Sequence, residues 1–346
     1  MLLPLFYAAL SERGMPMSLK EIARLVGVSP STVSRVLNNS SSNCASEELR
    51  RRIWAAANSL EYRPNPAARQ LRKGGAAAPR SLQLVVVAAR FATPEADPFF
   101  AQLFRSVEEE LFASGALLHG VISSAELQQQ GPPEADGYLL LGRCPSEALK
   151  SLCRHTENIV GIGRNSTDFR IDEIICSGQQ AALLAMEHLL SLGHRRIAYI
   201  GGCSYEERFI GYYEALRHHS LPLDQHLVQD TDQTGSSGRA AMARLLEQGG
   251  FTAALCANDA TALGALEALA EAGRADVDVI GIDNIAAAER VTPALSSVHI
   301  PKEEMGRAAV KLLLDRIRGG HREHVRMEFP CRLVLRASCK GPHSGK

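Results

Sequence analysis

The stretch 19-LKEIARLVGVSPSTVSRVLNNS-40 contains two apolar repeats separated by a glycine. In the first repeat, apolar residues recur at helical spacing as far as Val26, which indicates a short amphipathic helix. Gly27 then allows a tight turn. Ser29 can cap a second helix that begins at Pro30, since proline suits the first helical position. Two short helices around a glycine turn predict a helix-turn-helix.

The second helix has a small polar outer face. Val33, Val36 and Leu37 share its inner face. Small polar side chains on a helix can enter the major groove of DNA, and an arginine there can donate two parallel hydrogen bonds to a guanine edge. We therefore expect this helix to read DNA. Its outward positions are Ser31, Thr32, Ser34, Arg35 and Asn38.

A third helix is expected to start at Ser46 and to complete a small domain over residues 17–63. Its inner face carries apolar residues at helical spacing. Its role is mainly structural, because two short helices alone bury too little apolar area. The inner-face residues are Leu49, Ile53, Ala57 and Leu60.

The charge of the chain is divided unevenly. Residues 1–80 contain twelve Lys and Arg against five Glu and no Asp, whereas the remaining residues hold 26 basic and 33 acidic side chains. This asymmetry predicts a nucleic-acid-binding end joined to an acidic body, with chance clustering of surface arginines as the alternative. Residues 1–16 precede the first module, and we expect a disordered extension there or a start codon placed upstream of the native one.

Eight cysteines occur singly, and no CxxC pair is present. Several lie in apolar runs, which indicates reduced and partly buried thiols in a cytoplasmic protein. The apolar start of the chain is too short to span a membrane and lacks a basic segment before it. We expect no membrane partner.

A short hinge and linker is expected over residues 64–80. Asn65 can cap a helix of about two turns that ends at Gly74, and isolated helices below roughly 12–15 residues are marginal in water. This helix therefore requires stabilisation from elsewhere. Leu71 is an apolar side chain in a polar segment. It is either a stray linker residue or a wedge for the minor groove.

From residue 81 to about 340 short apolar strands alternate with amphipathic helices, which predicts doubly wound parallel sheets that bind ligands beyond the carboxyl ends of the strands. No GxGxxG follows the first strand, and the sequence contains no P-loop or nucleophile elbow. His321 and His324 are expected to be solvated rather than metal ligands. We predict no enzyme activity, no cofactor and no metal. The expected strands are 82–89, 137–142, 158–163, 196–202, 253–259 and 278–283.

Polar groups follow several of these strands. Guanidinium, amide and carboxylate groups beside an aromatic ring suit a polyhydroxylated ligand, whose hydroxyls form hydrogen bonds while an apolar face stacks. Asp259 is expected mainly to cap the helix that follows it, and one of Phe99 and Phe100 is expected to be a core residue. The candidate ligand residues are Asp97, Phe99, Arg208, Asn258 and Asp283.

Residues 19–40 resemble the headpiece of the lac repressor/galactose repressor family almost position by position, and the resemblance continues through 60-LEYRPNPAARQLRKG-74. It implies that Pro30, Ser31 and Arg35 read bases while Thr32 and Ser34 lie nearer the phosphates. It also implies that paired hinge helices insert a leucine into the minor groove, which favours the wedge. The further residues expected on DNA are Ser29, Asn38, Asn65, Ala68 and Leu71.

The body resembles the same family at 207-ERFIGYYEAL-216, 256-CANDATALG-264 and 279-VIGIDN-284. The resemblance implies a periplasmic-binding-protein-like domain of two lobes with Arg208, Asn258 and Asp283 on a sugar effector. Arg164 is a further possible contact. The implied protein is a homodimeric repressor on a palindromic double-stranded operator, and the sign of the effector's action stays open.

The resemblance implies that the chain crosses between the lobes near Ser177, Val298 and His321. The N-lobe is then about 81–176 with 299–321, and the C-lobe about 177–298 with 322–340. The segment 118–136 is short, and we expect it to lack a complete strand-helix-strand passage. In this the chain resembles, more weakly, the repressor of the evolved β-galactosidase system, which favours a β-galactoside or a related sugar. The alternative function is a sugar-binding protein without regulatory DNA binding.

Overall fold

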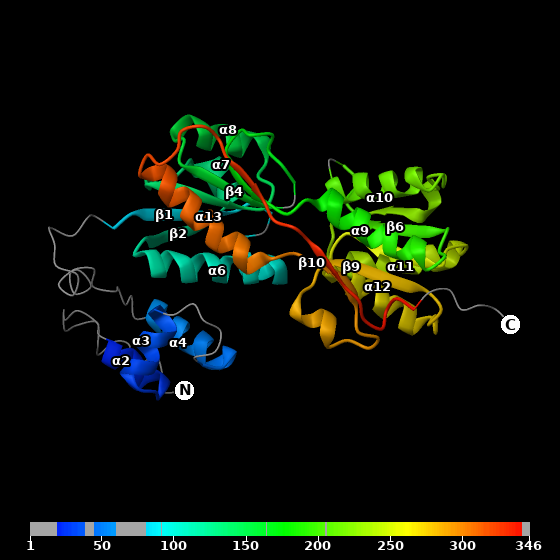
Figure 1. Cartoon of the computed structure of the whole chain (residues 1–346), viewed down its shortest axis with the longest axis horizontal. Coiled ribbons are helices and arrows are strands. Elements are labelled where there is room, and N and C mark those ends of the chain that lie inside the picture. The colour runs from blue at the N-terminus through cyan, green and yellow to red at the C-terminus, as the bar shows by residue number, and fades with distance from the viewer. Residues whose placement is uncertain are drawn as a thin grey trace. The chain divides into compact units, whose positions relative to one another are not determined.

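The computed structural model describes residues 19–38, 45–59, 81–90, 92–163, 165–204 and 206–340. The chain divides into two compact units. One contains the N-terminal helices, and the other contains two α/β lobes (Figure 1). The predicted combination of an all-α headpiece and a two-lobed α/β body is confirmed.

Three helices form the headpiece: α2 (Leu19–Val26), α3 (Pro30–Asn38) and α4 (Glu47–Ser59). The apolar faces predicted from the spacing meet in one core, which removes them from water. Its buried members are Ile22, Ala23, Val26, Val33, Val36, Leu37, Ile53, Ala56 and Ala57. The expected inner residue Leu60 lies outside the described residues.

The turn between α2 and α3 follows the local chemistry of its residues. Gly27 adopts φ +75°, a conformation that costs a residue with a Cβ more than it costs glycine. The Ser29 hydroxyl accepts from the Thr32 amide at 3.1 Å and caps α3. The guanidinium of Arg52 donates to the carbonyl of Val26 at 3.1 Å, so α4 also satisfies the last turn of α2.

The N-lobe contains a six-stranded sheet in the order β11-β5-β4-β3-β1-β2. Helices α7 and α8 cover one face, and α6 and α13 lie on the other (Figure 1). The strands are β1 (Gln83–Ala88), β2 (Leu117–Ser123), β3 (Gly137–Leu141), β4 (Ile159–Gly163), β5 (Asp172–Ile175) and β11 (Arg326–Glu328). The helices are α6 (Pro98–Ser114), α7 (Ser124–Gln130), α8 (Ser146–His155) and α13 (Lys302–Ile317), with a 3-10 turn at Pro94–Ala96.

The C-lobe repeats this plan with the order β12-β10-β9-β8-β6-β7. Its sheet is parallel except for the antiparallel pair β10–β12. The strands are β6 (Ile197–Gly201), β7 (Val228–Asp230), β8 (Ala253–Cys256), β9 (Asp278–Asp283), β10 (Ser296–His299) and β12 (Arg332–Val334). The helices are α9 (Gly178–Ser191), α10 (Glu207–His218), α11 (Gly235–Gln248) and α12 (Asp259–Glu271), with 3-10 turns at Gln225–Leu227 and Ala286–Glu289.

The chain passes between the lobes three times: after β5, after β10 and between β11 and β12. The third crossing was expected near His321, but it lies between Glu328 and Arg332, where the red segment runs from one lobe to the other in Figure 1. The reason is Asp172, which is fully buried. It accepts hydrogen bonds from Arg316, from His321 at 2.8 Å and from the amide of Val325 at 2.8 Å. These bonds keep the segment after α13 beside β5.

Two expectations about particular segments are corrected. His321 is not simply solvated, because it lies between the carboxylates of Asp172 and Asp315, and His324 approaches Asp172 as well. Segment 118–136 completes a strand-helix-strand passage through β2, α7 and β3. A capping box between Ser123 and Glu126 lets α7 form within a short stretch. Because this passage is present, it no longer favours a β-galactoside as the ligand.

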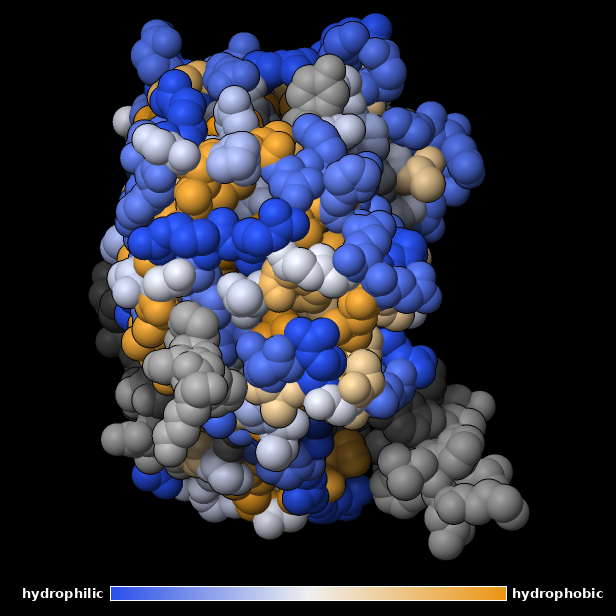
Figure 2. All heavy atoms as spheres, turned by 90° about the vertical axis from the view of Figure 1, so that its right-hand side faces the viewer, coloured by the Kyte–Doolittle hydropathy of each residue, from blue (hydrophilic) through white to orange (hydrophobic). Residues whose placement is uncertain are grey.

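No helix in the described ranges is long and apolar enough to cross a bilayer. Viewed toward the C-lobe side of Figure 1, hydrophobic residues form small groups between hydrophilic ones (Figure 2).

In the body, the close contact between helices α13 and α6 requires a small residue. A Cβ on Gly306 of α13 would lie 1.9 Å from the Ser106 hydroxyl of α6, so only glycine allows this approach.

Candidate functional site

The outward face of α3 carries a cluster of hydroxyl groups and one arginine. The Ser29 oxygen lies 2.8 Å from the hydroxyls of both Ser31 and Thr32. Arg35 is exposed one turn further on, and its Nε lies 3.4 Å from the Ser31 carbonyl. The helix begins at Pro30 as predicted. This face can present a guanidinium and small polar groups to base edges.

Several predicted DNA residues cannot be placed further. Ser34 and Asn38 belong to α3, but their side chains lie outside the described part of the chain. The hinge residues Asn65, Ala68 and Leu71 also fall outside the described residues. Their roles stay predictions.

The body has a cavity of about 400 Å³ between its two lobes. The N-lobe contributes residues that follow β1, β3 and β4 and those that start α6, whereas the C-lobe contributes the segment that leads into α10. This is the carboxyl-end position expected for ligands of doubly wound sheets. The lining residues are Ala89, Arg90, Phe99, Phe100, Gly142, Arg143, Gly163, Asn165, Ser204, Glu206 and Arg208.

Arg208 lines this cavity but is held by its own lobe. It is 2% exposed, and Glu206 accepts from its Nε and Nη2 at 2.7 Å each. Its Nη1 donates to the carbonyl of Ala257. Burial by itself lowers the pKa of Arg208, but the Glu206 carboxylate more than offsets this and raises it. The pair therefore stays ionised, in the bidentate geometry that arginine forms with carboxylates.

Gln233 joins this pair to the opposite lobe. Its side-chain oxygen accepts from Arg208 at 2.8 Å and from Arg90 of the N-lobe at 3.0 Å, while its amide nitrogen lies 3.3 Å from Glu206. Arg90 also donates to the main-chain oxygen of Asp232. A side chain that follows β1 is thus bonded to the C-lobe across the cavity. We call these four residues, Arg90, Glu206, Arg208 and Gln233, the cleft network.

Asn258 lies behind the cleft network and corrects one expectation. Asn258, not Asp259, caps α12, because its side-chain oxygen accepts from the Thr261 amide at 2.9 Å. Its nitrogen donates to the main-chain oxygen of Gln233 at 3.0 Å. Asn258 is 2% exposed, so it positions the loop that carries Gln233.

Asp259 instead ties the start of α12 to the next strand. Its carboxylate accepts from the Ile285 amide at 2.8 Å and from the Ser297 hydroxyl at 2.6 Å. Burial and the nearby Asp283 carboxylate raise the pKa of Asp259 to about 7. Asp283 is itself buried, and its main-chain oxygen accepts from the ammonium of Lys302.

The two predicted residues at the start of α6 have different roles. Asp97 accepts from the amides of Phe99 and Phe100 at 2.8 and 3.2 Å and so caps the helix. The Phe99 ring lines the cavity and packs edge-on against Phe100 at 5.1 Å between centroids. Both rings are also buried, so core packing and cavity lining coincide here. Arg164 lies outside the described residues.

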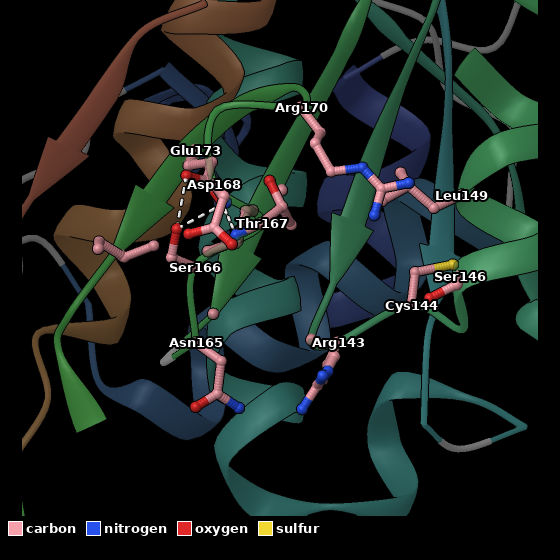
Figure 3. A pocket seen from close by; sticks show the side chains of 15 residues that line it. Arg143, Cys144, Ser146, Leu149, Asn165, Ser166, Thr167, Asp168, Arg170 and Glu173 are labelled. Carbon is pink, nitrogen blue, oxygen red and sulfur yellow. Dashed lines mark hydrogen bonds between the residues drawn. The ribbon is translucent and has the colours of Figure 1, made fainter. Parts of the chain in front are cut away.

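Arg90, Arg143, Asn165 and Glu206 line the cavity but were not predicted. Figure 3 shows a second, smaller hollow of about 160 Å³ in the N-lobe, and there Arg143 and Asn165 extend together away from Ser146 and Arg170. Both follow the carboxyl ends of strands, and that position was the available signal. Together these groups offer cationic and amide donors beside an aromatic wall.

A helix-turn-helix followed by two lobes around a polar cavity defines a class of ligand-binding transcription regulators. Residues 18–65 match the model of the bacterial regulatory proteins of the lacI family, and residues 186–339 match the periplasmic binding protein-like domain. The chain belongs to the lacI family, and it is a sequence-specific DNA-binding transcription regulator.

Named relatives cover nearly all of the chain. It is 32% identical to the HTH-type transcriptional repressor PurR of Erwinia tasmaniensis, covering 94% of this chain and 98% of that protein. It is 33% identical to the HTH-type transcriptional regulator GalR of Escherichia coli, covering 86% and 88%.

Solved structures agree with this assignment. The complex of the transcriptional regulator CelR with cellobiose is 30% identical, with a TM-score of 0.68 over 93% of this chain and 100% of that one. The lac repressor dimer bound to operator and the anti-inducer ONPF is 26% identical, with a TM-score of 0.65 over 94% and 99% of the two chains.

Proposed function

We propose that this protein represses transcription as a homodimer on a palindromic operator, and that a small ligand in the cavity between the lobes changes its affinity for DNA. The observation that carries the proposal is the cleft network. Arg90 and Arg208 meet on the Gln233 oxygen from opposite lobes. A ligand that takes over these donors changes how the lobes are joined, and it shifts an equilibrium only by binding one arrangement better than the other.

The proposed ligand is a sugar derivative that carries a negatively charged group. The described charges on the lining are three arginines against one carboxylate, and that carboxylate is already paired with Arg208. Arg90 donates to two neutral oxygens, those of Gln233 and of the Asp232 main chain, which an anion can replace. A phosphate or carboxylate can accept two parallel hydrogen bonds from a guanidinium, and such charge-assisted bonds are stronger than hydrogen bonds to neutral oxygens.

The rest of the lining suits the sugar part of such a ligand. Phe99 offers an apolar ring for a sugar face, and Asn165 and Ser204 offer hydrogen-bonding groups for hydroxyls. Similar solved structures include a regulator in complex with cellobiose and one with bound ribose, which supports a carbohydrate scaffold. The lining holds arginines and a paired carboxylate rather than a nucleophile with a base, so we propose that the cavity binds its ligand without catalysis. We also propose that the protein acts in the cytoplasm.

The first experiment is a thermal-shift comparison on the full chain with matched ligands: glucose, galactose and ribose, their phosphates, the corresponding aldonates, and β-galactosides. A ligand that binds the folded state raises Tm in proportion to its saturation. We expect an anionic member to raise Tm and its neutral partner to have little effect. Stabilisation by neutral sugars alone would refute the proposal of an anionic ligand, but the proposal that a ligand controls DNA binding would stand.

The second experiment tests regulation itself. Selection from random double-stranded DNA with the full chain should yield a palindrome, as expected for a dimer with two-fold symmetry. The affinity for this palindrome should change when the stabilising ligand is added. Specific DNA binding that no stabilising ligand affects would instead exclude ligand control.

A further inference from the structure

Two cysteines lie together where the chain crosses between the lobes. Cys176 follows β5 at the first crossing, and Cys331 lies between β11 and β12 at the third. Strands β5 and β11 are paired in parallel with Ile175 opposite Glu328, and the Phe329 amide donates to the Ile175 carbonyl at 2.8 Å. This register brings the two crossings side by side, and the side chains of Cys176 and Cys331 are hydrogen-bonded to each other.

The two thiols differ in accessibility and acidity. Cys176 is fully buried, whereas Cys331 is partly exposed. The hydrogen bond from Cys176 lowers the pKa of Cys331 to about 7, although burial acts in the opposite direction. At neutral pH a large share of Cys331 is therefore thiolate, the form that reacts with oxidants. An accessible thiolate beside a second, buried thiol is the arrangement of a redox-sensing pair.

The other described cysteines lack this combination. Burial raises the pKa of Cys144 and of Cys203 to about 11, and that of Cys339 to about 12. Cys153 is the most exposed of the described thiols, but burial of its sulfur still raises its pKa. Cys144 and Cys153 lie close enough to interact electrostatically, so they form the natural competing pair. Exposure alone favours oxidation at Cys153, whereas thiolate character favours Cys331.

We infer that Cys331 and Cys176 form a reversible disulfide when the protein meets a hydroperoxide. The Cys331 thiolate attacks one peroxide oxygen, the O–O bond breaks, and the departing hydroxide takes up a proton and leaves as water. Cys331 is then a sulfenic acid. The Cys176 sulfur attacks the Cys331 sulfur, the S–O bond breaks, and the Cys176 proton leaves with the oxygen as a second water. One hydrogen peroxide gains two electrons, and two thiols are oxidised to one S–S bond.

This disulfide joins two of the three segments that connect the lobes. The first and third crossings already lie beside one another because β5 and β11 are paired, so the disulfide links two segments that are in contact without it. A dithiol reductant reverses it by thiol–disulfide exchange. The site lies at the crossings, and its formation does not depend on the identity of any ligand.

The test uses the reduced full chain, treated with one equivalent of hydrogen peroxide at pH 7, quenched with acid and denatured for thiol titration. The thiol count should fall from the eight cysteines of the chain to six, and dithiothreitol should restore it. Peptide mapping without reduction should recover the Cys176 and Cys331 peptides as one linked species. In the untreated protein, alkylation of Cys331 by iodoacetamide should show a midpoint near pH 7.

Matched variants separate this pair from the alternatives. Cys331→Ser should keep all of its thiols under the same treatment, whereas Cys153→Ser should still lose two. Circular dichroism establishes that both variants fold, and the mapping of the unmutated chain stands without them. A Cys144–Cys153 linkage would overturn the inference. Full retention of thiols would overturn it as well, and so would an alkylation midpoint for Cys331 above pH 8.5.

Discussion

The two lobes share one topology but contribute different groups to the cavity between them. Both sheets have six strands, with the last strand to join each sheet at one edge. In the C-lobe the charged groups at the cleft are bonded to each other, as in the buried pair of Glu206 and Arg208. In the N-lobe, Arg90 and Arg143 reach the cavity from strand ends. We infer that the C-lobe provides a rigid, preorganised wall of the cavity and that the N-lobe arginines select the ligand.

The largest expected effect comes from breaking the C-lobe pair. Glu206→Gln leaves the buried guanidinium of Arg208 without its counter-charge, and loss of one partner of a buried pair costs about 3–5 kcal/mol. Urea denaturation, monitored by circular dichroism, should show that the free energy of unfolding falls by about this amount. A change below about 1 kcal/mol, which is the range of exposed ion pairs, would contradict a stabilising role for the buried Glu206–Arg208 pair.

The second effect concerns pH and again lies in the C-lobe. The pKa of Asp259 is raised to about 7 from 3.8, so the folded protein holds this proton more tightly than the unfolded chain. Its contribution to stability is therefore present at low pH and is lost as pH rises to about 7. Between pH 5 and pH 7 the loss should be about 2 kcal/mol, at about 1.4 kcal/mol per pKa unit.

Asp172 in the N-lobe provides the contrast for this pH dependence. Burial by itself raises the pKa of Asp172, but hydrogen bonds from Arg316, Val325 and His321 lower it overall. Its contribution is lost only as pH falls below the ordinary aspartate range. Because an amide does not ionise, Asp259→Asn should become more stable relative to the unmutated chain as pH rises from 5 to 7. Parallel pH profiles for the two proteins would contradict the assignment.

A third effect tests the headpiece separately from both lobes. Arg35→Ala should lose about 1–3 kcal/mol of discrimination at one base pair, because a bidentate guanine contact is removed. Competition binding between the selected operator and its single-base variants measures this loss. An equal loss of affinity on operator and random DNA would reduce Arg35 to a phosphate contact.

The smallest effect on stability is expected in the N-lobe. Arg90→Gln should change the free energy of unfolding by less than about 1 kcal/mol, because its acceptors are at the cavity and one of them is a main-chain oxygen. Its effect on ligand binding should be larger, with affinity for an anionic ligand falling at least about tenfold, as for a lost charge-assisted hydrogen bond of roughly 1.5–3 kcal/mol. Isothermal titration calorimetry measures it. Arg170→Gln serves as the control, since Arg170 lines only the smaller of the two hollows described.

The long strands could be predicted from the sequence, whereas the shortest ones could not. Continuous apolar runs such as 82–89 and 278–283 became β1 and β9, because their side chains are buried on both faces of a sheet. Strands β7, β11 and β12 have three residues each and little apolar signal. Their pairing depends on partners far along the chain, and so did the position of the third crossing.

The candidate site was predicted in part for the same reason. Arg208 and Phe99 line the cavity as expected, but Glu206, two residues from Arg208, was missed because a surface glutamate and a buried partner look alike in sequence. Arg90 and Arg143 were missed because a strand-end arginine is usually solvated. Asn258 was predicted on the ligand, yet both its polar atoms form hydrogen bonds within the lobe. Only the fold decides which polar groups remain directed at a cavity.

The most direct test of the account is the affinity of the full chain for its selected palindrome, measured with and without the anionic ligand that stabilises it, for the unmutated protein and for Arg90→Gln. We predict a ligand-dependent change in DNA affinity of at least about tenfold, which corresponds to a coupling of about 1.4 kcal/mol, and the loss of this change in Arg90→Gln. An equal ligand-dependent change in both proteins would contradict the role of the cleft network, and no change in either would contradict ligand control.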